Sequence, residues 1–223
     1  MSGGASDRLG RFLTAWLGAW PGTDGAVTAV ASDRRAAPAW DGRANPIVGV
    51  VTPTGGVVSV RPDLHPAAAA ALAGTAPADV PAALSDAVGG RVGAGIFRWS
   101  DDPVAFEPVG RWVPFDDPVV PPWLRPFGGE VLVATDDGGR YLAGVGLKRH
   151  DPTGEEISVG TEEAARGKGL ARRLVSQAAR RVVDERHAAV TYLHAPDNLA
   201  SARVAEACGF PDLGWKVIFG APA

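Results

Sequence analysis

The chain has 223 residues, of which 46% are hydrophobic and 21% are charged, and its formal net charge is −3 at pH 7. This composition is typical of a folded globular protein and excludes an intrinsically disordered one. The negative net charge argues against nucleic acid or an anionic membrane as a partner. No apolar run is long enough to cross a bilayer, and residues 1–7 lack the features of a signal peptide, so we expect a cytoplasmic protein.

The single cysteine, Cys208, excludes a disulfide within the chain. It has no nearby Cys or His with which to complete a zinc site, and no other residues show the spacing of metal ligands. We therefore expect a buried thiol and no metal ion.

The first part of the chain carries weaker patterns than the rest. Apolar residues at helical spacing, β-branched runs beside a Gly-rich turn, and an alanine-rich segment are its main signals. The expected elements, in chain order, are a helix over 9–20, a hairpin with strands 47–51 and 57–60, and short helices over 66–73 and 79–88.

Residues 100–128 are rich in proline and aspartate, and Pro118, Pro121 and Pro122 exclude long regular elements there. We place a boundary in this stretch, between an N-terminal region of residues 1–105 and a second domain of residues 106–223. The N-terminal region is either a separate module, such as a degenerate half with the fold of the second domain, or an elaborated beginning of that fold.

The pattern becomes clear after residue 130. Two β-branched runs flank the turn sequence of residues 136–139, which predicts a hairpin. The expected elements of this part are strands over 131–135, 141–147 and 155–161, a helix over 170–186, a strand over 190–193, a helix over 198–208 and a strand over 215–219. This order predicts a mixed α/β layer.

The most informative motif is the run Arg166-Gly167-Lys168-Gly169-Leu170-Ala171, which lies between a predicted strand and a predicted helix. A basic, glycine-rich turn at a helix start can bind a phosphate group, because glycine lets backbone N–H groups approach the anion and the helix N-terminus carries partial positive charge. A Walker-type loop is excluded because Gly169 follows Lys168 where Ser or Thr is required. A dinucleotide-binding turn is excluded because Arg172 occupies the third glycine position.

Three features in this order resemble the GNAT superfamily of acyl-CoA-dependent N-acetyltransferases. The turn fits that family's Q/R-x-x-G-x-G/A loop. Residues 198–210 resemble its N-x-x-(A/S)…E-x-x-G-F signature, and the strand 190–193 stands just before Asn198, as the family's fifth strand does. The resemblance covers residues 130–220.

The resemblance implies an α/β fold with a mixed, mostly antiparallel sheet, splayed central strands and flanking helices, preceded here by an N-terminal α/β region. It also implies acetyl-CoA as co-substrate, with the pyrophosphate at the turn and the pantetheine arm on an open strand edge. Arg203 or Arg173 would reach the nucleotide phosphates. The cofactor-binding residues that it implies are Val159, Gly160, Thr161, Arg166, Gly167, Lys168, Gly169, Leu170, Ala171, Arg172, Asn198 and Ser201.

The catalytic residues are less clear. Many family members place an acid, a tyrosine, seven residues after the conserved Asn, and here that position is Ala205. Tyr192, a water molecule or unassisted departure of the thiolate would have to replace it. Glu155 is our first candidate for the base that deprotonates the amine, and Glu156, which faces the other way, is the reserve. His150 and His194 lie at strand ends where a substrate could approach.

These patterns together predict an N-acetyltransferase that moves the acetyl group of acetyl-CoA to a primary amine by direct attack in a ternary complex. The acceptor is expected to be a small molecule or a peptide, and the protein a monomer or a homodimer. The alternative is an acyl-CoA sensor or regulatory protein without turnover, which Ala205 favours.

Overall fold

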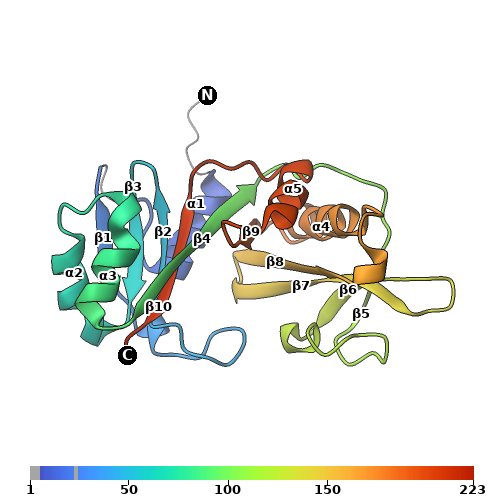
Figure 1. Ribbon diagram of the computed structural model, residues 1–223, viewed down its shortest axis with the longest axis horizontal. Coiled ribbons are helices and arrows are strands. Elements are labelled where there is room, and N and C mark those ends of the chain that lie inside the picture. The colour runs from blue at the N-terminus through green and yellow to red at the C-terminus, as the bar shows by residue number, and fades with distance from the viewer. Residues whose placement is uncertain (1–5, 23–24) are drawn as a thin grey trace. The chain divides into compact units, whose positions relative to one another are not determined.

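The computed structural model describes residues 6–22 and 25–223 (Figure 1). Residues 1–5, which contributed to the argument against a signal peptide, lie outside the described residues. The chain forms two compact units. The first contains Met1–Phe97, Leu193–Asp197 and Asp212–Ala223, and the second contains Arg98–Tyr192 and Asn198–Pro211.

This grouping differs from the boundary after residue 105 because of the last strand. β10 (Lys216–Ala221) lies far along the chain, but it pairs on one side with β2 (Ile47–Thr52) and on the other with β4 (Arg91–Ser100). A strand belongs with the strands that bond it, so the end of the chain completes the first unit rather than the second.

The first unit contains strands in the order β1, β3, β2, β10 and β4. Apart from the parallel pair β1 and β3, its pairings are antiparallel. Its remaining elements are α1 (Asp7–Leu17), β1 (Val27–Ala31), η1 (Asp33–Arg35), β3 (Gly55–Val60), η2 (Pro62–Leu64), α2 (His65–Leu72), η3 (Pro77–Asp79) and α3 (Val80–Val88). One face of this sheet packs against α2 and α3 through valine, leucine and isoleucine side chains.

α1 is stabilised at both ends. The hydroxyl of Ser6 accepts a hydrogen bond from the amide of Leu9, which is an N-cap, and Gly18 ends the helix in the left-handed conformation. At the C-terminal end, Arg34 donates to the carbonyl oxygen of Ala15 and Arg35 to that of Trp16, at 3.0 and 2.8 Å. The negative end of the helix dipole therefore explains why Arg35 is buried.

The second unit carries the segment that the sequence motifs singled out. Its strands follow the order β9, β8, β7, β6 and β5, and only β8 and β9 pair in parallel. Its elements are β5 (Arg111–Pro114), η4 (Arg125–Phe127), β6 (Glu130–Thr135), β7 (Tyr141–Asp151), β8 (Gly154–Thr161), η5 (Glu163–Ala165), α4 (Leu170–Arg180), the π-helical turn η6 (Arg181–Glu185), β9 (Ala189–His194) and α5 (Leu199–Ala207).

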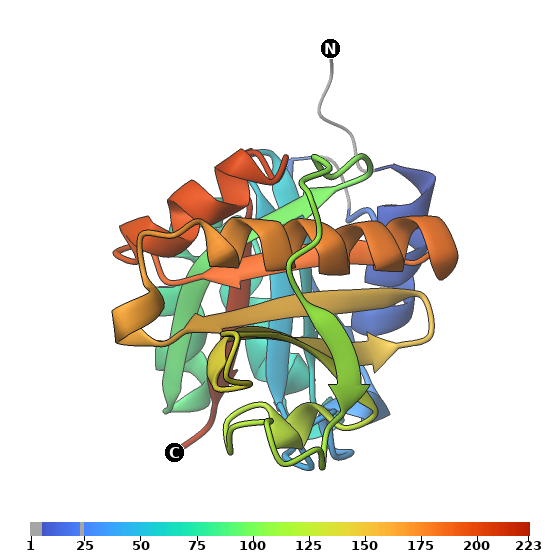
Figure 2. The ribbon, with the colours of Figure 1, turned by 90° about the vertical axis from the view of Figure 1, so that its right-hand side faces the viewer.

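One face of the strands of this unit is covered by α4, which runs roughly along β8 (Figure 2). Leu174, Val175 and Ala178 of α4 pack on alternate residues of β7 and β8, such as Val145 and Ile157. This spacing places the basic residues of α4 on its outer side, as an amphipathic helix requires.

The opposite face is covered by the proline-rich segment before β6. Trp123 and Phe127 of that segment lie so close to β8 and β7 that a Cβ atom on Gly160 would come within 2.7 Å of the Trp123 ring, and one on Gly146 within 2.4 Å of the Phe127 ring. Glycine at these two positions therefore lets the segment lie directly on the strands.

The predicted fold class is confirmed, and each predicted helix and strand is present with shifted ends. β1, β4 and β5 were not predicted. β4 contains Gly93 and Gly95, which lower its apparent strand propensity, and β5 is short and lies beside prolines. Within residues 6–22 and 25–223, no helix is long and apolar enough to cross a membrane.

Candidate functional site

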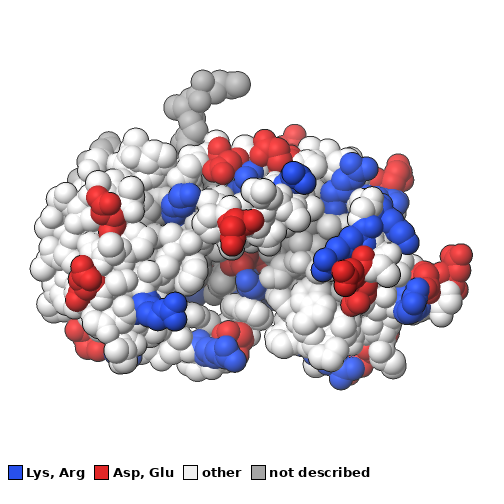
Figure 3. Space-filling model, viewed as in Figure 1, with Lys and Arg blue, Asp and Glu red and all other residues white. Residues whose placement is uncertain are grey.

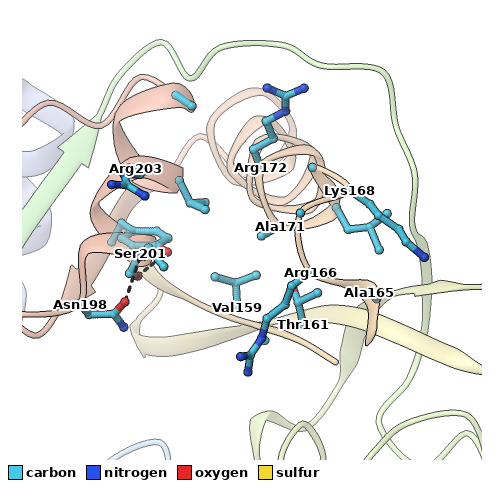
Figure 4. A pocket seen from close by; sticks show the side chains of 18 residues that line it. Val159, Thr161, Ala165, Arg166, Lys168, Ala171, Arg172, Asn198, Ser201 and Arg203 are labelled. Atoms are coloured by element: carbon cyan, nitrogen blue, oxygen red, sulfur yellow. Dashed lines mark hydrogen bonds between the residues drawn. The ribbon is translucent and has the colours of Figure 1, made fainter. Parts of the chain in front are cut away.

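A cavity of about 990 Å³ opens in the second unit between β8, the turn before α4, and α5 (Figure 4). This volume lies at the upper end of the range for small-molecule sites. The residues that line it are Val159, Gly160, Thr161, Ala165, Arg166, Gly167, Lys168, Gly169, Leu170, Ala171, Arg172, Tyr192, Asn198, Ala200, Ser201, Arg203, Val204 and Ala207. All twelve residues predicted for the cofactor are among them.

The cavity begins where two neighbouring strands separate. β8 pairs with β7 along its whole length, but its pairing with β9 stops at Ile157 and Tyr192. Beyond that pair, no strand among the described residues bonds the edge of β8 that faces β9, over residues 158–161. The backbone N–H and C=O groups of this edge are available to an extended ligand, as in strand addition.

The basic, glycine-rich turn of residues 166–171 lies at the far end of this open edge. Gly167 has a φ of +78° and Gly169 a φ of +74°, a conformation that favours glycine. Gly169 is the N-cap of α4, so the turn presents the first N–H groups of an eleven-residue helix to the cavity. An anion is favoured at such a helix start by both hydrogen bonding and the helix dipole.

Basic side chains surround this helix start. Arg166 and Lys168 come from the turn and Arg203 from α5 (Figure 4), and Figure 3 shows arginine and lysine side chains gathered over α4 and the turn. The Arg172 guanidinium lies 5.3 Å from the centre of the Phe106 ring. Arg173 does not line the cavity, because it donates to the carbonyl oxygens of Glu107 and Pro108.

The opposite wall of the cavity is the first turn of α5. The Asn198 side chain accepts a hydrogen bond of 3.0 Å from the Ser201 amide and so caps the helix. The Ser201 hydroxyl lies 2.8 Å from the Tyr192 hydroxyl. Burial raises the pKa of Tyr192, more than its bond to Ser201 lowers it, so the phenol stays protonated at neutral pH.

Glu155 lies outside the cavity lining, in a buried ion-pair cluster. Arg186 donates to both of its carboxylate oxygens, at 2.7 and 2.6 Å, and Arg149 donates twice to one of them, at 3.0 and 2.9 Å. Its side chain is only 4% exposed. These contacts connect β7, β8 and the segment after α4. Such a cluster stabilises the fold.

Glu156 also lies outside the cavity lining, on the sheet face opposite that of Glu155. Its carboxylate accepts a hydrogen bond from Lys148 and lies 3.0 Å from Nε2 of His150. Burial raises the pKa of Glu156, but the His150 hydrogen bond and the Lys148 charge outweigh burial, and the pKa is lowered overall. Glu156 is therefore a carboxylate at neutral pH.

Neither Ala205 nor Cys208 supplies a reactive group. Ala205 is fully buried, so the common tyrosine position holds only a methyl group. Cys208 is also buried, its thiol donates to the carbonyl oxygen of Arg172 at 3.2 Å, and burial raises its pKa to about 12. A thiol with this pKa is not a nucleophile at neutral pH.

A buried arginine explains part of the second motif. Arg98, at the end of β4, is 5% exposed and donates to Glu206 and to the carbonyl oxygen of Phe210, both at 2.9 Å. Glu206 and Phe210 are the Glu and Phe of the E-x-x-G-F signature. The sequence offered no sign of this partner, because Arg98 lies more than a hundred residues earlier in the chain.

Replacing Arg98 by methionine is expected to lower the free energy of unfolding by about 2 kcal/mol, because the buried carbonyl of Phe210 loses its donor. Urea denaturation would measure this loss. The exposed Arg111→Met is the control and should change stability little. Equal losses in the two variants would contradict the role assigned to Arg98.

Metal-ligating side chains do not cluster in the described part of the chain. There, no group of three or more His, Cys, Asp or Glu residues is arranged to hold a metal ion.

The acetyltransferase (GNAT) family model matches residues 96–210. No protein of curated function matches the chain. Similar solved structures include a GNAT acetyltransferase from Colwellia psychrerythraea, with 12% identity and a TM-score of 0.47 over 59% of this chain. A GCN5-related N-acetyltransferase from Kribbella flavida has 14% identity and a TM-score of 0.47 over 65%. A GCN5-related N-acetyltransferase-like protein from Streptococcus suis has 16% identity and a TM-score of 0.45 over 62%.

The chain covers 56%, 64% and 66% of the length of these three proteins, which is less than two thirds of each. The family model, in contrast, spans just over half of the present chain, including the turn at α4 and the Asn198 helix. The chain belongs to the GNAT family of acetyltransferases.

Proposed function

We propose that this protein transfers the acetyl group of acetyl-CoA to a primary amine by direct attack in a ternary complex. Membership of the GNAT family supports acyl-CoA-dependent N-acetyl transfer in general. GNAT acetyltransferases act on small-molecule or peptide acceptors, and the acceptor here is an amine of one of these two kinds.

One observation carries the proposal: a single cavity joins an open strand edge to a basic helix start. The pyrophosphate would lie at the N–H groups of residues 167–171, near Arg166 and Arg203. The two amides of the pantetheine arm would pair with the edge of β8 over 158–161 and lead the thioester toward Tyr192. Asn198 and Ser201 would form the other wall of the pantetheine channel.

Calorimetric titration with acetyl-CoA, CoA and dephospho-CoA tests the binding half of this proposal. We expect acetyl-CoA and CoA to bind with similar affinity, because most of their contacts are shared. A release assay for the CoA thiol, run over primary amines, aminoglycosides and peptides with free N-termini, tests the transfer half. Absence of binding by both acetyl-CoA and CoA would contradict the proposal.

We propose that the Glu156 and His150 pair accepts the proton that the acceptor amine loses. Glu155 is bonded by two guanidinium groups, which stay charged and cannot pass a proton on, whereas Glu156 bonds an imidazole, which can. Glu156 also lies only two residues before Ser158, where the strands begin to separate.

Replacing Glu156 by glutamine is expected to lower kcat at neutral pH by about tenfold to a hundredfold, within the range of general base catalysis. The affinity for acetyl-CoA should stay unchanged, because Glu156 does not line the cavity. A pH profile of kcat/KM would show the loss as an altered acidic limb. An unaltered profile would remove Glu156 from the mechanism.

A second candidate function is acyl-CoA binding without turnover, which the methyl group of Ala205 favours. This function uses the same cofactor site as the transferase and differs from it only in that no acetyl group is transferred. Tight acetyl-CoA binding with no thiol release over the whole amine panel would support it over the transferase.

A further inference from the structure

Two hydroxyl groups stand where β8 and β9 separate. Tyr192 forms the last pair of the two strands with Ile157, and its hydroxyl meets that of Ser201 at 2.8 Å. From Thr161 back to Ile157 the edge of β8 spans about 13 Å, at about 3.3 Å per residue. A pantetheine arm that follows this edge away from the glycine-rich turn therefore runs toward the Tyr192 and Ser201 pair.

Both residues line the cavity, but their side chains are exposed to different extents. Tyr192 is 1% exposed and packs against Phe210, with a ring distance of 5.9 Å. Ser201 is half-buried, in the first turn of α5, and lines the cavity. Because Ser201 is the more exposed of the two, a ligand atom in the cavity reaches its hydroxyl more readily than the Tyr192 phenol.

Either hydroxyl can be the donor in this hydrogen bond, and a protonated phenol allows Tyr192 to donate. Arg98 and Cys208 are among the charged and titratable groups near Tyr192, and burial keeps both the phenol and the Cys208 thiol protonated. A protonated phenol can donate to the Ser201 oxygen, and the Ser201 hydrogen is then free to point into the cavity. Such chained hydroxyl groups polarise one another.

We infer that Ser201, polarised by Tyr192, donates a hydrogen bond to the CoA sulfur as it leaves, and so replaces the acid that is missing at Ala205. This inference rests on the proposed function. Ser201 is then the catalytic residue, and Tyr192 is a positioning residue that acts through it.

The chemistry balances without a covalent enzyme intermediate. The amine nitrogen forms a bond to the thioester carbonyl carbon, and the C–S bond breaks with its electron pair on sulfur. The proton that the nitrogen loses passes to the base and then to water. The sulfur leaves as a thiolate held by the Ser201 hydroxyl, and takes a proton from water after it leaves the site.

A second feature favours a thiolate at the same place. Ser201 belongs to the first turn of a nine-residue helix that Asn198 caps, so the partial positive charge of that helix end adds to the hydroxyl bond. Helix N-termini lower the pKa of cysteine thiols in the same way.

The experiment measures the pKa of the thiol in bound CoA, from the ultraviolet absorbance of the thiolate as the pH is raised. We expect a pKa below that of free CoA in the wild-type protein. Ser201→Ala should raise the bound thiol pKa by about one unit, the effect of one hydrogen bond to a charged group, and Tyr192→Phe should raise it by less. Once an amine acceptor is identified, Ser201→Ala should lower the rate of single-turnover acetyl transfer by about tenfold relative to the wild-type protein.

The control is Tyr141→Phe, which removes the only other tyrosine hydroxyl of the chain. Tyr141 packs in the cluster with Leu124 and Val133, on the sheet face opposite α4. Its hydroxyl donates a long hydrogen bond of 3.5 Å to the carbonyl oxygen of Gly160, three residues along β8 from Ile157, so its removal should leave the bound thiol pKa unchanged. Thermal denaturation of all three variants would show that each is folded.

The outcomes separate the two proposals. Failure of the folded wild-type protein to bind CoA would overturn the proposed function and this inference with it. Normal CoA binding and transfer, together with an unaltered thiol pKa in Ser201→Ala, would overturn the inference alone. An equal shift in Tyr141→Phe would also overturn it, since the effect would then not come from the Ser201 hydroxyl.

Discussion

Replacing Glu155 by glutamine is expected to lower the free energy of unfolding by about 3 kcal/mol and to leave turnover by the folded protein near the wild-type value. The carboxylate is buried and receives four hydrogen bonds of 2.6 to 3.0 Å from two arginines. Glutamine has nearly the same shape but no charge, so both guanidinium groups lose their counter-ion. This loss of stability lies at the lower end of the range for breaking a buried ion pair. The reason is that the side chains of Arg186 and Arg149 are 27% and 63% exposed and remain hydrated.

Glu130→Gln is the matched control for this variant. Glu130 pairs with Arg181 at 2.7 Å, but it is 49% exposed, and exposed pairs contribute about 0 to 1 kcal/mol. Urea denaturation of both variants, with kcat and its pH profile measured at a temperature where both are folded, separates the two roles of Glu155. Wild-type stability with a strong loss of kcat would show that Glu155 is the base.

The cofactor side of the site could be predicted because its signals are local. The strand, the turn at Gly167 and Gly169, and α4 are consecutive in the chain, so periodicity and turn composition place them together. The same holds for Asn198, which caps the helix that it begins.

The residues around the reacting atoms could not be predicted in the same way, because contacts between distant segments decide their environment. Glu155 and Glu156 are adjacent, yet one bonds Arg149 and Arg186 while the other bonds Lys148 and His150. Strand alternation shows that the two side chains face opposite ways, but it does not show which side chains they contact on each face.

The division of the chain depends on pairing as well. β4 lies near the middle of the sequence and β10 near its C-terminal end, and the two form an antiparallel pair from Ile96 and Lys216 to Arg91 and Ala221. The glycines of β4 leave its strand pattern weak, so neither the strand nor its partner could be read from local composition.

Replacing Gly169 by valine is expected to weaken acetyl-CoA binding tenfold or more, which corresponds to about 1.4 kcal/mol. Gly169 has a φ of +74°, and a β-branched residue there would force the turn into another conformation. The N–H groups at the start of α4 would then no longer converge on one point. A side chain would also enter the space that the pyrophosphate needs, since Gly169 lines the cavity.

Gly139→Val isolates this effect from backbone strain. Gly139 has a nearly equal φ of +80° in the exposed turn between β6 and β7, away from the cavity lining, and a Cβ there meets nothing within 4 Å. Both variants should lose similar stability, on the order of 1 to 2 kcal/mol for a non-glycine residue in this conformation. Calorimetry should then show weak acetyl-CoA binding only for Gly169→Val. Equal affinities in the two variants would mean that the anion does not lie at this turn, and the cofactor site would have to be sought elsewhere.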